Sequence, residues 1–331
     1  MSKVRDFLGP YRLARLIRLG SVCQVWEAIE SHTQKHFALK VLRPEKRTDK
    51  TELGFLKWEH SVAADFNHKN VIHIHDFVTD ADTPFLVLEL FSEMNLKMAL
   101  RRGPEGIAHL VEKIMLQTAE ALFYIHEKGF VHCDVKPDNI LVNRDGEVRV
   151  IDFTIAVKKK TGLSKLFHFG SKQQGTRSYM SPEQILAKKA LDERADVYSL
   201  GCTFYELLTG KLPFTAPSPN ELLSKHLSSP VPSAVVHNNN ITPEFNAVLR
   251  SMLAKDPADR PSSMWEVAKA VKGVKVFVRP PRLPESTIFD DIPMGGRVEN
   301  LPQASDGEKK TSGAEQGGES TPGAGSDSTP A

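Results

Sequence analysis

The sequence has few cysteines, no long apolar run and no marked excess of either charge, and each shortage excludes a class of protein. Its three cysteines, Cys23, Cys133 and Cys202, lie far apart and lack the spacing of a zinc site, so we expect neither disulfides nor structural zinc. The roughly eighteen consecutive apolar residues of a membrane-spanning helix occur nowhere, and no signal peptide is recognised at the N-terminus. We therefore expect a cytoplasmic protein.

Charge and size set further limits. The 331 residues include 43 Lys and Arg against 41 Asp and Glu, so the overall charge does not favour binding to nucleic acid or to a membrane surface. A hydrophobic content of 40% is enough for a sizeable core. These numbers predict a globular protein without a nucleic-acid or membrane partner, and they leave the oligomeric state open.

The composition changes near Lys275. From Pro280 to Ala331 the chain is rich in Pro, Gly, Ser and Glu, and it holds four Lys or Arg residues against nine Asp or Glu. Such a segment has too few large apolar residues to form a packed core. We predict that residues 273–331 form a disordered, acidic tail.

Apolar periodicity predicts a small sheet near the N-terminus and helices after residue 90. The predicted strands are 11–16, 23–28, 36–41 and 85–90, and the predicted helices are 51–66, 107–127, 195–209 and 243–253. Turn residues at 143–146 separate two short apolar runs and predict a β-hairpin. The most informative polar segment comes directly before this hairpin.

That segment runs from Val131 to Asn139 and carries Asp134, Lys136 and Asn139 at fixed spacing. Transfer of a phosphoryl group to a hydroxyl requires a carboxylate that orients the attacking oxygen, a cation beside the transferred charge and an oxygen ligand for Mg²⁺. The three side chains provide these groups. The alternative, a loop in which they only make turns, does not explain so specific a combination.

The segment resembles the catalytic loop of protein kinases, His-Arg-Asp-x-Lys-x-x-Asn. The resemblance covers residues 11 to about 272 and implies an α+β, bilobal kinase fold. Its N-lobe would be a small antiparallel sheet with one main helix in residues 1–90, with the domain proper starting at about residue 11. Its larger, mainly helical C-lobe would span residues 91–272.

Other motifs of this family follow in the expected order. Thirteen residues after Asn139, Asp152 lies in Ile-Asp-Phe-Thr, which is similar to the Asp-Phe-Gly motif and implies a second Mg²⁺ ligand. Lys40 ends Phe-Ala-Leu-Lys, which resembles the strand whose lysine neutralises the α- and β-phosphates. Glu59 has the spacing of the glutamate that pairs with this lysine. In isolation, Lys40 or Glu59 would be interpreted as a surface charge.

The glycine-rich loop is the weakest match. Aligned on Val25, its three glycine positions hold Arg18, Gly20 and Cys23, so two side chains stand where glycines let backbone N–H groups approach phosphate. We expect a loosened or reshaped phosphate cover. The resemblance implies ATP with Mg²⁺, or Mn²⁺ in its place, and a set of residues that bind them. These residues are Leu19, Gly20, Val25, Ala38, Lys40, Glu59, Leu88, Glu89, Phe91, Asn139 and Asp152.

The C-terminal half resembles the substrate-docking and structural motifs of the family. Glu183 ends a segment that is similar to the peptide-docking segment closed by Ala-Pro-Glu, and Arg260 matches the arginine that pairs with it. Asp196 matches the aspartate that hydrogen-bonds the catalytic-loop backbone. Lys136 and Thr176 are the residues that, in the family, favour Ser/Thr over Tyr as the acceptor.

Three departures qualify the resemblance. Cys133 replaces the catalytic-loop arginine that pairs with a phosphate in many members, so we expect that switch to be absent. Thr154 replaces glycine after Asp152 and should narrow the conformations of that turn. The stretch from Lys158 to Arg177 is basic without an acidic residue, which fits either an attraction to acidic peptides or a solvated loop.

We therefore predict an ATP- and Mg²⁺-dependent protein kinase in which Asp134 and Lys136 are catalytic and the substrate is a Ser or Thr hydroxyl of a protein, including the chain itself. The main alternative is a pseudokinase that binds nucleotide or partners without turnover, which the altered glycine loop favours. A small-molecule phosphotransferase is disfavoured by the peptide-docking segment. A hydrolase with Asp134 and Asp152 as paired carboxylates is disfavoured by their sequence context.

Overall fold

The computed structural model describes residues 7–79, 83–91, 94–159, 177–188 and 190–283. The chain separates into two compact units, Met1–Gly296 and Arg297–Ala331, and all the described residues belong to the first. Thr176, most of the basic stretch after Lys158, and the predicted tail from residue 284 onward lie outside the described residues.

Up to residue 89 the chain forms mainly β-strands with one α-helix, and after it α-helices dominate. The strands are β1 (Phe7–Leu8), β2 (Tyr11–Leu19), β3 (Cys23–Glu30), β4 (His36–Leu42), β5 (Ile74–Val78), β6 (Phe85–Glu89), β7 (Met94–Asn95), β8 (Phe130–Val131), β9 (Ile140–Val142), β10 (Val148–Val150) and β11 (Val157–Lys158). The α-helices are α1 (Lys50–Ala63), α2 (Leu96–Arg101), α3 (Val111–Glu127), α5 (Pro182–Ile185), α6 (Arg194–Thr209), α7 (Pro219–Ser228), α8 (Pro243–Met252) and α9 (Met264–Gly273). Short 3₁₀ helices are η1 (Pro44–Lys46), η2 (Pro104–Leu110), η3 (Pro137–Asn139), η4 (Ala234–Val236) and η5 (Pro257–Asp259).

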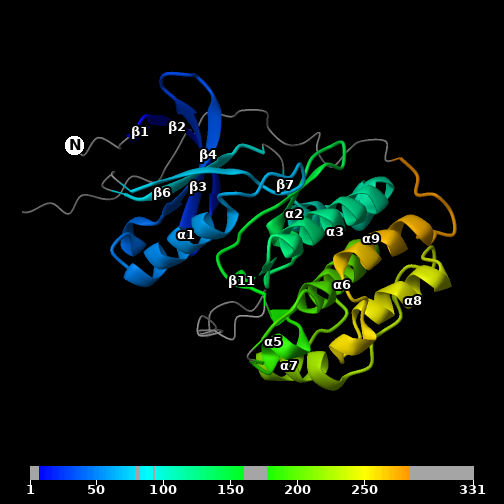
Figure 1. The fold of residues 1–331 in the computed structure, drawn as a ribbon. Coiled ribbons are helices and arrows are strands. Elements are labelled where there is room, and N and C mark those ends of the chain that lie inside the picture. The colour runs from blue at the N-terminus through cyan, green and yellow to red at the C-terminus, as the bar shows by residue number, and fades with distance from the viewer. Residues whose placement is uncertain (1–6, 80–82, 92–93, 160–176, 189, 284–331) are drawn as a thin grey trace, which may run out of the picture. The chain divides into compact units, whose positions relative to one another are not determined.

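The N-lobe is built on a six-stranded antiparallel sheet with the order β1-β2-β3-β4-β6-β5. Its two faces are apolar, because Leu39, Val41 and Phe85 pack in one cluster and Ala38 and Leu86 in the other. Helix α1 lies against the sheet beside β5 and β6 (Figure 1). The α+β, bilobal class predicted from the sequence is confirmed.

Helix α1 carries a site residue on its inner face because of its periodicity. Its first turn is capped by Asp49, whose carboxylate accepts hydrogen bonds from the backbone N–H groups of Thr51 and Glu52. Leu56, Glu59 and Ala63 recur at helical spacing and are buried. A glutamate is therefore carried into the interior with the apolar side chains of the same face.

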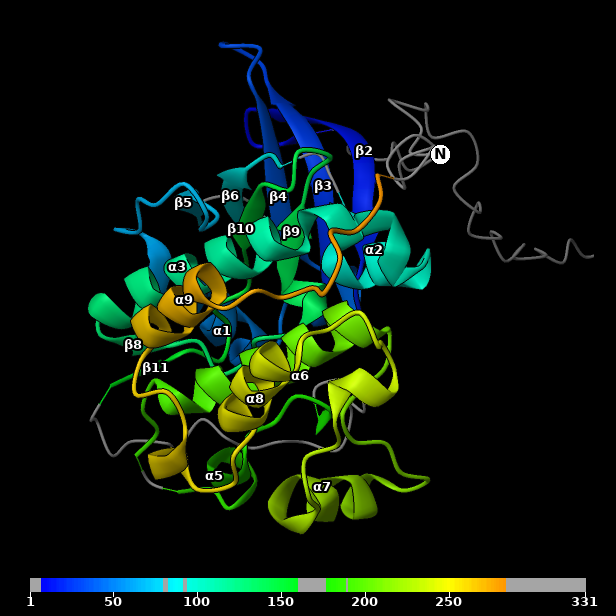
Figure 2. The same cartoon turned by 90° about the vertical axis from the view of Figure 1, so that its right-hand side faces the viewer.

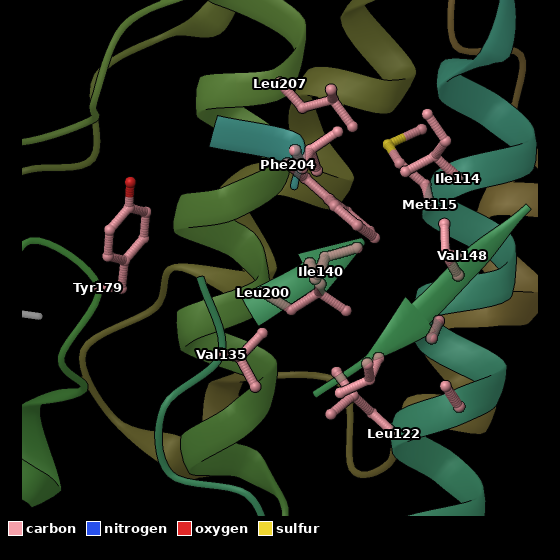
Figure 3. Packing of buried hydrophobic residues seen from close by; sticks show 14 of the residues in the cluster. Ile114, Met115, Leu122, Val135, Ile140, Val148, Tyr179, Leu200, Phe204 and Leu207 are labelled. Carbon is pink, nitrogen blue, oxygen red and sulfur yellow. The ribbon is translucent and has the colours of Figure 1, made fainter. Parts of the chain in front are cut away.

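The C-lobe is a group of helices around α6. In both views α3 lies beside α9, and α6 lies beside α8 (Figures 1 and 2). Figure 3 shows the core between them, where Ile114 and Leu122 of α3 gather with Leu200 and Phe204 of α6 and with Val148 of the β9–β10 hairpin. This apolar cluster supports the hairpin that connects the two polar motifs predicted to be catalytic.

Several boundaries differ from the sequence prediction: β2 runs on to Leu19 and α1 ends at Ala63 rather than at residue 66. The helix expected to start at Ile107 begins at Val111, because Pro104 starts a separate 3₁₀ helix that ends at Leu110.

The predicted start of the tail at residue 273 is too early, because Val276 and Phe277 are buried and Phe277 forms a β-bridge with Ile241. Backbone hydrogen bonds from the Thr242 N–H to the Val276 carbonyl at 3.0 Å and from the Val278 N–H to the Asn240 carbonyl at 2.7 Å hold this segment in place.

Among the described residues, no helix combines the length and the apolar composition needed to cross a bilayer.

Candidate active site

The two halves of the molecule meet at an ion cluster. The Lys40 ammonium on β4 lies 2.6 Å from Glu59 Oε2 on α1 and 3.2 Å from Asp152 Oδ1, which follows β10. Glu59 is 2% exposed, whereas 31% of the Asp152 side chain is exposed. The structure therefore brings together three residues predicted from separate motifs. Two of them, Lys40 and Asp152, are 112 positions apart along the chain.

The pKa values in this cluster follow from one cation facing two carboxylates. Burial favours the neutral amine of Lys40, but the charges of Asp152 and Glu59 outweigh burial and raise its pKa. Burial opposes ionisation of Asp152 too, yet Lys40 and the Thr154 hydroxyl hold its pKa well below its usual range. Burial raises the pKa of Glu59, against the attraction of Lys40. The cluster is acidic overall, which suits a further cation.

The catalytic-loop residues form a second group. Lys136 Nζ lies 2.6 Å from Asp134 Oδ2, and Asn139 Nδ2 donates to the Asp134 backbone O and to Oδ2 at 2.9 Å each. Burial raises the pKa of Asp134, although Lys136 opposes the shift. The Ile151 N–H donates to the Asn139 carbonyl at 3.0 Å, which connects this loop to the residue before Asp152.

The loop backbone is fixed by buried side chains from elsewhere. Asp196 on α6 accepts hydrogen bonds from the backbone N–H groups of His132 and Cys133 at 2.7 and 2.8 Å, and it contacts His126 Nε2 at 2.8 Å. Burial would raise the pKa of Asp196, but these hydrogen bonds keep it below its usual value. Gln184 Nε2 donates to the Cys133 carbonyl at 2.8 Å.

Cys133 shows why such anchoring is needed. Its φ of 66° is in the left-handed region, which is strained for a residue other than glycine. Both of its backbone polar groups are held by Asp196 and Gln184, so the strain is maintained by its surroundings. Its thiol is buried beside Val131, Leu191 and Ala195, and burial raises its pKa, so it is an unreactive core group.

Glu183 and Arg260 form a buried, two-pronged ion pair. Arg260 Nη1 and Nη2 donate to the two carboxylate oxygens of Glu183 at 2.7 and 3.0 Å. The same guanidinium donates to the backbone carbonyls of Ala254, Arg194 and Lys255 at 2.7 to 3.0 Å. These contacts join α5 to the start of α6 and to the loop after α8.

Residues predicted to contact adenine lie on the sheet and at its edge. The register places Val25 opposite Lys40 and Ala38 opposite Leu88, so these four side chains share one face of the sheet. Leu19 ends β2 with 59% of its surface exposed, so this position is open rather than packed.

The hairpin turn between β2 and β3 is closed by the Gly20 N–H, which donates to the Cys23 carbonyl at 2.9 Å. A Cβ on Gly20 would lie 3.0 Å from that carbonyl oxygen, so a larger residue would crowd this turn. The Cys23 side chain packs partly buried against the core, and burial raises the pKa of its thiol to about 11. The turn therefore forms without the other two glycines.

Glu89 ends β6 and Phe91 follows it, where the chain crosses between the lobes. Arg149 Nε donates to Glu89 Oε1 at 3.0 Å, and its guanidinium lies 4.9 Å from the centroid of the Phe91 ring. The Glu89 N–H donates to the His73 carbonyl at 2.9 Å. Arg149 is a contact that the sequence did not predict, because no local motif relates the hairpin to this crossing.

Several other contacts of the site and of the C-lobe were not predicted from the sequence. Thr154 was noted only as a departure from glycine, yet its hydroxyl lies within the ion cluster. Trp58 Nε1 on α1 donates to the Ala156 carbonyl at 2.9 Å. In the C-lobe, Lys97 and Tyr179 both contact the buried Glu206 of α6. A Thr directly after the Phe that follows Asp152 was a usable sequence signal; the others have none, because their partners are distant in the chain.

Asn139 and Asp152 each keep an oxygen atom that could bind a divalent cation. Asn139 turns its Nδ2 toward Asp134, which directs its amide oxygen the other way, and the hydrogen bonds that Asp152 makes with described residues all fall on Oδ1. Within the described ranges, no three His, Cys, Asp or Glu side chains are grouped to hold a metal. One carboxylate and one amide oxygen fit Mg²⁺, which usually takes its remaining ligands from phosphate and water.

Comparison with known proteins agrees with this geometry. Residues 11–272 match the protein kinase domain family. The chain belongs to the protein kinase family. Relatives include the serine/threonine-protein kinase PknA of Mycobacterium tuberculosis, which is 35% identical over 83% of this chain and 63% of its own length. PknH of Mycobacterium bovis is 36% identical over 81% of this chain and 44% of its own length.

A probable serine/threonine-protein kinase of Streptomyces coelicolor, SCO3848, is 30% identical over 81% of this chain and 40% of its own length. The chain thus spans less than two thirds of the length of each of these curated relatives. All three carry the name of a kinase, so the family placement predicted from the catalytic loop is confirmed, and the pseudokinase alternative is not favoured.

Proposed function

We propose that this chain is an ATP- and Mg²⁺-dependent protein kinase that phosphorylates Ser or Thr hydroxyls of proteins. The observation that carries the proposal is the Lys40–Glu59–Asp152 cluster beside the catalytic loop, since a largely buried lysine held by two carboxylates is positioned for phosphate. Similarity to relatives named serine/threonine-protein kinases supports the acceptor class.

The side chains would divide the chemistry between them. Asp152 and Asn139 would hold Mg²⁺, or Mn²⁺, which when bound neutralises the charge of the phosphates. Lys40 would contact the α- and β-phosphates, and Glu59 would keep its ammonium in place. Val25, Ala38 and Leu88 would enclose adenine, with the backbone of Glu89 and Phe91 at its edge.

The catalytic loop would act on the acceptor. Asp134 would accept a hydrogen bond from the substrate hydroxyl and orient its oxygen toward the γ-phosphorus, and its raised pKa makes it a better proton acceptor. Lys136, 2.6 Å from Asp134, would stabilise charge on the transferred group. Thr176, predicted to contact Asp134 and favour Ser/Thr substrates, remains part of this proposal.

The cellular setting is also part of the proposal. Cys23, Cys133 and Cys202 are unpaired, which supports a reducing, cytoplasmic location.

The test is transfer of labelled phosphate from [γ-³²P]ATP, with Mg²⁺ or Mn²⁺, to the chain itself and to a basic and an acidic model protein. We expect metal-dependent label on Ser or Thr, identified by phosphoamino-acid analysis, that is lost in Asp134→Ala. If wild type transfers nothing while nucleotide still raises its melting temperature, the pseudokinase replaces this proposal.

A further inference from the structure

Thr154 stands where the family motif has glycine, and its hydroxyl lies at the centre of the ion cluster. Its Oγ1 lies 2.5 Å from Asp152 Oδ1, 3.2 Å from Glu59 Oε2 and 3.4 Å from Lys40 Nζ. A glycine makes none of these contacts. The replacement therefore adds one polar group that touches all three residues of the cluster.

The hydrogen-bond inventory of a hydroxyl fixes the direction of these contacts. A hydroxyl has one hydrogen to donate and two lone pairs, and the shorter contact assigns that hydrogen to Asp152. The Lys40 ammonium, which has donors only, then donates to the Thr154 oxygen, and the 3.2 Å approach of Glu59 Oε2 is a contact between two oxygens without a hydrogen bond. The Thr154 backbone N–H also lies 3.4 Å from Asp152 Oδ1. One oxygen of Asp152 is thus held by both Lys40 and Thr154.

Thr154 does not disturb the backbone. Among the described residues other than glycine, positive φ values occur at Gln34, Cys133, Asp152 and Ala187, so the conformation at Thr154 does not require glycine. From the sequence, threonine was expected to restrict the backbone conformations of this turn, but Thr154 already has a backbone conformation that any residue can adopt without strain. Any effect of Thr154 must come from its side chain.

We propose that Thr154 is a positioning residue that fixes the Asp152 carboxylate, holding Oδ1 in the ion cluster and leaving Oδ2 for a divalent cation. The proposal rests on the proposed function for the identity of that cation, the one bound with ATP. A partner that orients a metal-binding carboxylate typically changes metal affinity by about 10- to 100-fold. Because Lys40 shares the task, we expect the lower end of this range.

The experiment compares Thr154→Val, which keeps the shape and removes the hydroxyl, with Thr154→Ser, which keeps the hydroxyl. Thr118→Val is the matched control, because Thr118 is buried and its hydroxyl donates to the Ile114 carbonyl at 2.7 Å, within α3. Thr154→Ala is a second variant without the hydroxyl, used if Thr154→Val unfolds.

The first readout is binding of Mn²⁺ to each variant saturated with a non-hydrolysable ATP analogue, followed by the EPR signal of the free ion. We expect Thr154→Val to bind Mn²⁺ about tenfold more weakly than wild type, and Thr154→Ser and Thr118→Val to bind within about twofold of wild type. Equal affinity of Thr154→Val and wild type, or equal weakening by Thr154→Ser, overturns the proposal.

The second readout is the Mg²⁺ concentration that gives half-maximal phosphate transfer. Thr154→Val should need about tenfold more Mg²⁺, with a rate at saturating Mg²⁺ close to that of wild type. If wild type transfers no phosphate but Thr154→Val still binds Mn²⁺ more weakly than wild type, the role of Thr154 is supported and the kinase activity is refuted. Normal transfer with an unchanged Mg²⁺ requirement refutes the role of Thr154 alone.

Discussion

Two charged groups of this molecule differ in how completely their polar atoms are used. In the C-lobe, the Arg260 guanidinium is bound on every side, by both oxygens of Glu183 and by three backbone carbonyls. In the ion cluster of Lys40, Glu59 and Asp152, one ammonium faces two carboxylates, and Asp152 keeps part of its surface exposed. The saturated group holds the chain in place, whereas the unsaturated group retains the capacity to bind a ligand.

The contrast predicts which property each substitution changes. Removing a group from the C-lobe pair leaves a buried charge without its partner, so the free energy of unfolding should fall. Replacing Asp152 of the ion cluster should reduce catalysis with little loss of stability, because part of its side chain is exposed to solvent and Lys40 stays paired with Glu59. The predictions below test this division, from the largest effect to the smallest.

Lys40→Met should lower the rate of phosphate transfer by about 100-fold or more, since a preorganised charge aimed at the phosphates is lost. The measurement is kcat/KM for ATP, alongside thermal unfolding. Adding Glu59→Gln to this variant should lower the rate little further, because Glu59 acts through Lys40. Additive losses in the double variant would show that the two residues act independently.

Arg260→Ala should destabilise the fold by about 3 to 5 kcal/mol, because Glu183 would remain buried without a cation. Chemical denaturation measures this loss, and Arg260→Lys keeps the charge if the alanine variant does not fold. Lys272→Ala is the matched control: its pair with Glu120 is at the surface, where such pairs contribute about 0 to 1 kcal/mol. Equal destabilisation by both would contradict the division drawn above.

His226 makes the C-lobe sensitive to acid. It is fully buried on α7, its Nδ1 lies 3.0 Å from the Tyr198 hydroxyl, and burial together with the charge of Lys255 lowers its pKa to about 4. The unfolded chain therefore binds a proton at higher pH than the folded one, and stability is lost as pH falls from about 6.5 to 4.

The expected loss is on the order of 2 to 3 kcal/mol over that interval. Denaturation at a series of pH values should show a flatter profile for His226→Gln than for wild type. Parallel profiles would mean that His226 is protonated in the folded state.

Arg149→Ala should raise KM for ATP by about 3- to 10-fold with kcat nearly unchanged, because the partly exposed ion pair to Glu89 and the contact with the Phe91 ring are each worth about 1 kcal/mol or less. Arg149→Lys, which keeps the charge without the planar group, should fall in between. Arg144→Ala, an exposed arginine in the same hairpin, provides the control. A drop in kcat instead would place Arg149 outside nucleotide binding.

The fold was predictable because its signals are local. Apolar segments separated by polar turns gave β2, β3 and β4, a continuous apolar run gave β6, and turn residues between two apolar runs gave the β9–β10 hairpin. Boundaries were less accurate where a neighbouring element decides them, as at Pro104 and at Phe277, which is ordered by its bridge to Ile241.

The candidate site was predictable where motifs state residue types at fixed spacing, as for Asp134, Asn139 and Asp152. Contacts between distant segments were not, because a single sequence does not say which side chains meet. Arg149 and Glu89 are 60 residues apart, and no local pattern relates them. Thr154 lies between these cases: its position was known, but its partner Glu59 was not.

The measurement that tests the central claim most directly is Asp152→Ala, assayed in parallel for phosphate transfer from labelled ATP and for thermal unfolding. We expect transfer to fall to background while the melting temperature stays near that of wild type, since 31% of this side chain is exposed to solvent. Unchanged transfer would contradict the role of Asp152. Loss of both properties would show that the ion cluster holds the fold together as the C-lobe pair does.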